Sequence, residues 1–444
     1  METFLIKALQ LIASLSLLVI VHEMGHFMFA RIFKVRVEKF YLFFNPWFSL
    51  FKYKPKNSET EYGIGWLPLG GYVKIAGMID ESMDKEQLQK PAEPWEFRAK
   101  PAWQRLLIMV GGVMMNLILA FLIYSMITFV WGNNYIPLRN AKLGMDFSQT
   151  AKNIGFEKGD ILLSADGVTL ERFDDQAFRK IVESKEVTVL RDGKEVKIAI
   201  PSDFMQTILK EKEDNKIPFT MMRYPMVVHQ AVKGQEAERA GLQTRDSIVG
   251  INGQMGLSLT DITTAFAENK GKQVSLDYYR NGILSSTTVN VDTLGKIGVM
   301  LESPLKTYEA VTERFSFFES FPKGAQKAAN KLTGYVSDMK YVFTKEGAKS
   351  VGGFGAIGGL FPSEWSWPDF WELTAFLSVA LAFMNIIPIP ALDGGHVMFL
   401  FYEMITGKQP NEKFMEYAQM AGMIFLFGLM LYANGMDLFR FFMK

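Results

Sequence analysis

The chain has 444 residues, of which 49% are hydrophobic and 21% are charged, and its formal net charge is +1. This length exceeds that of one compact domain, and the composition suits membrane-spanning helices joined to soluble modules. The near-neutral charge excludes a nucleic-acid-binding protein, which needs a concentrated basic face. With no cysteine and only four histidines, any metal site must be built from imidazole and carboxylate ligands.

Four apolar stretches are long enough to cross a bilayer as helices. The first, Met1–Ile32, lacks the small-residue cleavage site of a signal peptide, which predicts a retained helix. The others are Leu106–Trp131, Phe370–Ile387 and Ala418–Tyr432. We therefore predict an α-helical membrane protein with four transmembrane helices.

Basic residues are concentrated between the first and second apolar stretches. Because loops rich in Lys and Arg remain on the cytoplasmic side, we expect this loop to be cytoplasmic. Alternation then places the residues from about 133 to 368 outside the cytoplasm, together with both termini. The basic residues of the loop are Arg31, Lys34, Arg36, Lys39, Lys52, Lys54, Lys56, Arg98, Lys100 and Arg105.

The first stretch contains a His-Glu-x-x-His motif, formed by His22, Glu23 and His26. Residues four apart share a helix face, so both imidazoles can reach one Zn²⁺, and the adjacent Glu23 can act as the base that activates water. A charged residue at the centre of an apolar helix costs roughly 2.5–3.5 kcal/mol, which a bound cation would offset. Alternatively, the helix ends near Val21 and these groups are interfacial.

Two features follow the motif. Glycine alternates with apolar residues from Gly63 to Ile75, around Pro68, which predicts a membrane-associated β loop over about residues 60–80, shaped like a hairpin. An ordinary interfacial hairpin is the alternative. The second apolar stretch carries Asn116, an amide that in such a helix ordinarily forms an interhelical hydrogen bond.

The region between the second and third stretches contains an internal repeat, because residues 155–167 align with residues 241–253. Each copy has a short apolar strand closing on Asp-Gly or Asn-Gly, then a helical stretch and a hairpin. The pattern resembles tandem PDZ domains, which we place at residues 138–203 and 224–303. The alternative is two small β-rich modules without a peptide groove. Residues 307–361 should form an amphipathic helical connector that ends in a glycine-rich stretch, Val351–Phe361.

A catalytic zinc site needs a third protein ligand, and a sequence at the end of the third stretch supplies candidates. There Pro388 and Pro390 break the helix, and the glycines after Asp393 permit an irregular backbone. This arrangement presents Asp393 at membrane depth. His396 is the rival ligand, although it falls within the next helix, so we favour Asp393.

Together these motifs resemble the site-2 protease family of intramembrane zinc metalloproteases. The resemblance rests on His22-Glu23-x-x-His26 in the first span and on Asn385-x-x-Pro388-x-Pro390-x-Leu392-Asp393-Gly394 in the third. The Pro68–Lys74 segment, the Gly111–Asn116 stretch and the paired PDZ-like modules extend it over most of the chain. In one departure, this chain has Gly112-Val113 where family members usually carry Gly-Pro.

The resemblance implies a role for each site residue. His22, His26 and Asp393 would be the zinc ligands, and Glu23 would be the catalytic base. Asn385 would approach the bound substrate, and the β loop would pair with its backbone. The predicted substrate-binding residues are Asn385, Pro388, Gly70, Gly71, Tyr72 and Asn116.

We therefore predict an intramembrane zinc metalloprotease of the bacterial inner membrane. Its substrate would be a single-span membrane protein in the lipid bilayer, and the resemblance implies an anti-sigma factor already cut by a site-1 protease. Two rival functions remain. A non-catalytic membrane PDZ adaptor or chaperone would not need Glu23, and a metal transporter should show polar positions along several helices or two matching halves.

Overall fold

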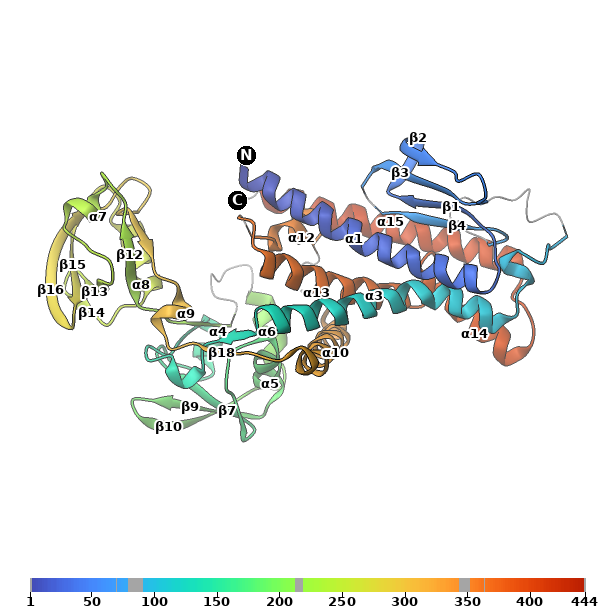
Figure 1. Cartoon of the computed structure of the whole chain (residues 1–444). Coiled ribbons are helices and arrows are strands. Elements are labelled where there is room, and N and C mark those ends of the chain that lie inside the picture. The colour runs from blue at the N-terminus through green and yellow to red at the C-terminus, as the bar shows by residue number, and fades with distance from the viewer. Residues whose placement is uncertain are drawn as a thin grey trace. The chain divides into compact units, whose positions relative to one another are not determined.

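The computed structural model describes residues 2–68, 70–78, 91–211, 219–342, 352–362 and 364–442 (Figure 1). The chain divides into two compact units. One comprises Met1–Gly132 together with Arg314–Lys444, and the other comprises Asn133–Glu313. The first unit contains the apolar helices, and the second contains the internal repeat.

Among the described residues of the first unit, four helices are long and apolar enough to cross a membrane, as predicted. The fourth apolar segment, Lys413–Phe439, is longer than the predicted Ala418–Tyr432. The second of these helices is continuous through Gly112-Val113. The four helices are α1 (Glu2–Ile32), α3 (Ala102–Val130), α13 (Trp367–Ile386) and α15 (Glu412–Phe442).

Helices α1 and α3 pack against each other at a glycine contact. A Cβ atom on Gly25 would lie 2.2 Å from the carbonyl oxygen of Gly111, so only glycine permits this approach of the two backbones. On the other side of α3, Ala120 and Tyr124 pack with Ala375 of α13 in a fully buried core. Helix α3 therefore lies between α1 and α13.

A four-stranded sheet follows α1, with strand order β2-β3-β1-β4 (Figure 1). This order corrects the predicted hairpin over Gly63–Ile75, because β3 and β4 are not paired with each other. Strand β1 lies between them, parallel to β3 and antiparallel to β4. Phe27 of α1 makes an edge-to-face contact with Phe40 of β1, so the sheet packs against the helix. The strands are β1 (Val37–Leu42), β2 (Phe44–Tyr53), β3 (Glu61–Leu67) and β4 (Tyr72–Ile75), and a 3₁₀ helix, η1 (Phe97–Ala99), precedes α3.

The remaining helices of the first unit are α10 (Phe317–Val342), α12 (Phe354–Leu360) and α14 (Asp393–Thr406). The amphipathic helix expected after the repeat is present as α10, whose Gly324 packs against Ser125 of α3. The glycine-rich stretch expected as a connector contains α12, whose first amides donate to Asp437 and Asn434 of α15. Residues 79–80 of the predicted β loop and 343–351 of the predicted connector lie outside the described residues.

The first repeat folds around a buried core that runs from Leu138 to Phe219, beyond the predicted boundary at residue 203. Phe204 and Ile208 of the helix after the hairpin complete this core. Its elements are η2 (Leu138–Asn140), β6 (Met145–Phe147), α4 (Gln149–Asn153), β7 (Ile161–Ala165), β8 (Val168–Thr169), α5 (Asp175–Glu183), β9 (Glu186–Arg191), β10 (Lys194–Ala199), α6 (Phe204–Glu211) and β11 (Thr220–Met222).

The second repeat has a separate core, which runs from Met226 to Ile297. Its sheet has the order β16-β15-β13-β12-β17, and β14 pairs with β13. Strands β5 (Asn133–Tyr135) and β18 (Val311–Glu313) pair where the chain enters and leaves the unit. The elements of this repeat are β12 (Met226–Ala231), α7 (Glu236–Arg239), β13 (Ser247–Ile251), β14 (Gln254–Met255), α8 (Leu259–Glu268), β15 (Gln273–Arg280), β16 (Ile283–Asn290), β17 (Val299–Leu301) and α9 (Pro304–Thr307).

Four tight turns predicted from Asp-Gly and Asn-Gly pairs are all present. The first residue of each pair, Asp166, Asp192, Asn252 or Asn281, has a φ between 46° and 50°. Such a left-handed backbone matches the twist of a two-residue hairpin and favours Asn, Asp and Gly. Each repeat therefore has two hairpins at corresponding places. Whether the repeats are PDZ domains remains a prediction.

Candidate active site

The two motif histidines lie one turn apart on α1 and face the same side. Their side chains are buried, with 8% of His22 and 5% of His26 exposed. The rings are perpendicular, with centroids 4.9 Å apart, and their Nε2 atoms lie 3.3 Å apart. The four-residue spacing therefore brings both ring nitrogens to one point, as the helix period predicts.

Asp393 reaches this point from the turn between α13 and α14. Helix α13 ends at Ile386, and Ala391, in the turn, has a φ of 78°, an unusual backbone for a residue with a side chain. A Cβ atom on Gly394 would lie 2.2 Å from the carbonyl oxygen of Ile387. The glycine after Asp393 is therefore needed for α14 to start directly against the broken end of α13.

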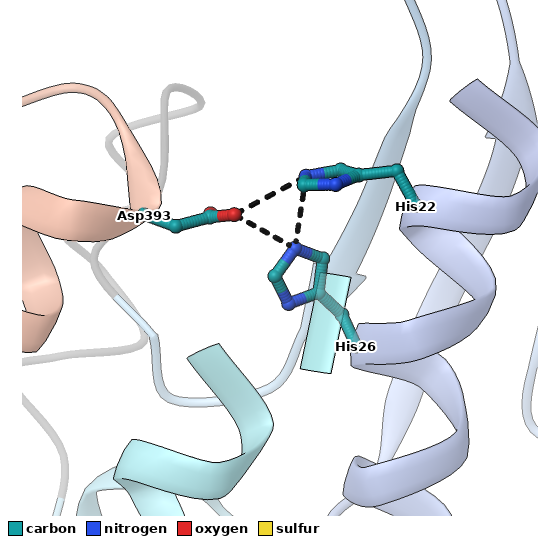
Figure 2. A group of neighbouring side chains, drawn as sticks. All are labelled: His22, His26 and Asp393. Carbon is teal, nitrogen blue, oxygen red and sulfur yellow. Dashed lines mark hydrogen bonds and ion pairs between the residues drawn. The ribbon is translucent and has the colours of Figure 1, made fainter. Parts of the chain in front are cut away.

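The ligand atoms of the three residues form a compact triangle (Figure 2). Asp393 Oδ2 lies 3.2 Å from His22 Nε2 and 3.3 Å from His26 Nε2. This oxygen is buried and forms no hydrogen bond in the described part of the chain. Ligands of a tetrahedral Zn²⁺ at about 2.0–2.1 Å are separated from one another by about 3.3 Å. The residues therefore fit a zinc ion in both chemistry and spacing.

His396, the rival ligand, lies outside this triangle. Among the described residues, the cluster of potential metal ligands comprises His22, His26 and Asp393 alone. His396 lies one turn after Asp393 on α14, and its Nε2 atom is 3.4 Å from the Gln419 amide of α15. The geometry therefore favours Asp393 as the third ligand.

The three residues open onto a cavity of about 410 Å³, whose wall also includes Glu23. Strand β4 forms the opposite wall, with Gly71 and Tyr72 among the lining residues. Because β4 ends the strand order, one of its edges is unpaired within the sheet. The backbone of Val73 in β4 forms a hydrogen bond with the Glu23 carboxylate. The cavity thus combines the candidate metal ligands, a carboxylate and an open strand edge.

The other predicted substrate-binding residues occupy different places. The amide nitrogens of Asn385 and Asn116 lie 3.3 Å from His22 Nε2 and 3.1 Å from His22 Nδ1, respectively. Pro388 lies in the turn before α14, and Gly70 lies two residues before β4. These four residues are not among the described residues that line the cavity. Their roles as substrate-binding residues remain predictions.

Tyr72 is fixed in a neutral form at the cavity wall. Burial raises the pKa of Tyr72 to about 12, and its hydroxyl donates a 2.9 Å hydrogen bond to Asn45. Its ring stacks on Tyr41 of the adjacent strand, with centroids 5.3 Å apart. The strand that lines the cavity is therefore held rigidly against β1.

Sequence reasoning named Asn116 of α3 as a site residue but missed the contacts that α3 makes with both histidines. The carbonyl oxygen of Ile108 accepts a 2.8 Å hydrogen bond from His26 Nδ1, and Gly112 leaves the space that both imidazoles occupy. The four-residue spacing of Gly112 and Asn116 was visible in the sequence. Its orientation toward the histidines was not, because an apolar helix gives little indication of which face meets which neighbour.

The comparison with protein families decides the assignment, since the profile of peptidase family M50 matches residues 10–429. The chain belongs to peptidase family M50. The match extends over the motif helix, both repeats and the turn that carries Asp393. The predicted resemblance to site-2 proteases is thereby confirmed.

Relatives of this M50 peptidase match it over nearly its entire length. It is 27% identical to the regulator of sigma-E protease RseP of Escherichia coli over 468 aligned residues, covering all of both chains. It is 28% identical to protease RseP of Yersinia pestis, covering 98% of this chain and 97% of the relative. It is 27% identical to metalloprotease MmpA of Caulobacter vibrioides, covering 99% and 96%.

The family settles the class of enzyme. M50 peptidases are zinc-dependent metalloproteases, so the predicted activity and cofactor are confirmed. The four apolar helices fit a membrane protein, as do its bacterial relatives.

Proposed function

We propose that this protein hydrolyses a peptide bond within or beside a transmembrane segment of a single-span membrane protein. In this proposal, His22, His26 and Asp393 hold the zinc ion and Glu23 is the catalytic base. One observation carries the proposal: the ligand atoms of His22, His26 and Asp393 lie 3.2–3.3 Å apart. Both histidines belong to a helix long and apolar enough to cross a membrane. A protease whose metal site is built into such a helix must receive its substrate at membrane depth.

The chemistry divides between the metal and Glu23. When bound, zinc supplies a Lewis acid that polarises the scissile carbonyl and acidifies water. Glu23 lines the same cavity and is adjacent in sequence to a ligand, so it is placed to take a proton from the attacking water. The same carboxylate then delivers that proton to the leaving amine nitrogen.

Strand β4 provides a means of holding the substrate. A transmembrane helix satisfies its own amide groups and must be unwound before a bond can be cut, which is costly in a bilayer unless the freed groups find partners. The open edge of β4, which begins at Tyr72, and the preceding Gly70 and Gly71 offer such partners through strand addition. In this proposal, Asn385 and Pro388 help position the unwound segment above the metal.

The outer repeats would act as a filter. We place both repeats and both termini outside the cytoplasm, because the loop between α1 and α3 is rich in Lys and Arg. As PDZ-like modules, they would admit substrates already shortened by a first protease. One relative is named a regulator of sigma-E protease, and in this proposal the substrate is an anti-sigma factor in a bacterial inner membrane.

A Glu23→Gln variant tests the proposal, because it keeps the size of the side chain while removing its basicity. The variant and the unchanged protein are reconstituted with a single-span substrate, and the products are identified by mass spectrometry. We expect cleavage inside the apolar segment to fall by at least 10³-fold in the variant, with zinc content unchanged. Equal turnover would instead favour the adaptor, and cleavage confined to soluble loops would refute the membrane-depth site.

A further inference from the structure

One face of α3 lies against both motif histidines. Its residues Ile108, Gly112 and Asn116 are each four positions apart, so they form a single line along the helix. Opposite them on α1 are His26 and His22, also four apart. Ile108 contacts His26 through its backbone carbonyl, and Asn116 contacts His22 through its side-chain amide. Gly112 lies between them and, having no side chain, leaves room for both rings.

The carbonyl of Ile108 determines which ring nitrogen of His26 carries the hydrogen. A carbonyl oxygen only accepts hydrogen bonds, so the 2.8 Å contact places the ring hydrogen of His26 on Nδ1. The other nitrogen, Nε2, then carries a lone pair directed at Asp393 Oδ2, 3.3 Å away. A hydrogen bond at one ring nitrogen thus prepares the other to bind a metal.

Gly112 lets both rings lie directly on α3. A Cβ atom at this position would lie 2.5 Å from His26 Nε2 and 2.6 Å from His22 Cε1. No side-chain carbon approaches other atoms so closely, so any larger residue displaces the rings. Gly112 is therefore the floor on which the two ligand side chains rest.

Asn116 contacts Nδ1 of His22, just as Ile108 contacts Nδ1 of His26. It is fully buried, and in the described part of the chain its amide is the sole hydrogen-bond partner of His22 Nδ1, at 3.1 Å. Its Oδ1 atom is buried with no partner among the described residues. The two ends of an amide are interchangeable by a half-turn, so this oxygen can face Nδ1. If it does, Nδ1 carries the hydrogen and Nε2 presents a lone pair.

We propose that Asn116 is a positioning residue that fixes the ring of His22 and, through its amide oxygen, the form of the ring that binds zinc. The inference rests on the proposed role of His22 as a ligand. It differs from a substrate-binding role, because Asn116 is completely buried and absent from the described residues that line the cavity. Ser378 of α13 donates a 2.7 Å hydrogen bond to the Asn116 backbone carbonyl, which is not the group that faces His22.

The test compares substitutions that remove or keep the acceptor. Asn116→Leu and Asn116→Ala remove it, whereas Asn116→Asp retains an oxygen that can accept from Nδ1. Zinc affinity is measured on the full-length protein in detergent by competition with a chelator. We expect affinity to fall 10–100-fold in the Leu and Ala variants, as is typical when the outer partner of a metal-binding histidine is lost, and to stay within about threefold in the Asp variant.

Ser378→Ala is the matched control, since it removes a hydrogen bond to the same residue without touching His22. We expect its zinc affinity to match that of the unchanged protein. Unchanged zinc affinity in the Leu and Ala variants, with a raised KM, would overturn the proposal in favour of substrate binding. Equal losses in the Leu, Ala and Asp variants would also overturn it, because the acceptor would then be irrelevant. Failure of the ligand assignment itself would appear separately, as undiminished zinc binding in His22→Ala.

Discussion

Three carboxylates of this protein have very different partners. In the repeats, Asp160 accepts hydrogen bonds from Arg191, and Asp246 accepts them from Arg280, at 2.6–2.8 Å. Each arginine also donates to a backbone carbonyl in the same loop, so the two repeats share one device. Asp393 instead faces two imidazole nitrogens, and no ion pair with an arginine is formed by it within the described part of the chain.

The difference shows which carboxylate is structural and which is functional. A carboxylate held by a guanidinium has its charge balanced and its oxygens satisfied within the protein, so it needs nothing further. Asp393 Oδ2 is buried and meets acceptors, which becomes favourable when a cation lies between them. Matched substitutions of the two kinds of carboxylate should therefore have opposite effects.

The largest effect is expected from Asp393→Asn. The amide removes the negative charge that draws zinc to the site, so we expect zinc binding to be lost and peptide cleavage to fall on the order of 10³-fold or more. The fold should be kept, because the Oδ2 atom of Asp393 has no hydrogen-bond partner in the described structure and the amide has almost the same size. Metal analysis and cleavage rates check this prediction, and full zinc occupancy in the variant would contradict it.

The opposite outcome is expected from Asp246→Asn in the second repeat. Removing one partner of a buried ion pair leaves Arg280 without its counter-charge, at a cost of about 3 kcal/mol in the stability of that repeat. Hydrogen exchange of the β13 and β15 amides should accelerate accordingly, while zinc content stays unchanged. Unaltered exchange would mean that the Arg280–Asp246 pair contributes little.

Gly112→Ala tests whether zinc binding requires the close packing of both histidine rings against α3. Because the added Cβ atom would meet both imidazoles at 2.5–2.6 Å, the rings must move, and we expect zinc affinity to fall roughly 10–100-fold. Gly428→Ala on α15 is the matched control, since nothing lies within 4 Å of its Cβ position. Similar zinc affinity in both variants would show that the rings adapt without loss.

The smallest effect concerns Asp261, which joins the two repeats. Burial opposes ionisation, but hydrogen bonds from Lys158, Ser258 and Arg223 outweigh it and hold the pKa of Asp261 far below its usual value. Because folding lowers this pKa, the charged form stabilises the fold at neutral pH, and the gain is lost as pH falls below about 3.9, the value in the unfolded chain.

We therefore expect Asp261→Asn to lower the stability of the second repeat by about 1–2 kcal/mol at pH 7. The difference from the unchanged protein should shrink as pH falls from 4 to 2.5. Hydrogen exchange of the α8 amides, corrected for the intrinsic pH dependence of exchange, measures both quantities. A difference that stays constant over this range would indicate that the charge of Asp261 is not involved.

The amino-acid sequence by itself determined the local features of this protein. Four apolar stretches predicted the four long helices, and Asp-Gly and Asn-Gly pairs predicted the hairpin turns of both repeats. The spacing of His22 and His26 predicted that the two imidazoles share a helix face. These predictions hold because helix period, turn geometry and apolar length each depend on residues that are close together in the chain.

Only the tertiary structure decided how distant segments combine. It inserted β1 between β3 and β4, where the sequence indicated a simple hairpin. It brought Asp393 within 3.3 Å of both histidines and placed one face of α3 beneath them. Strand pairing and helix packing depend on which surfaces meet, and in apolar helices nearly every face is hydrophobic, so the pattern along the chain does not specify the partner.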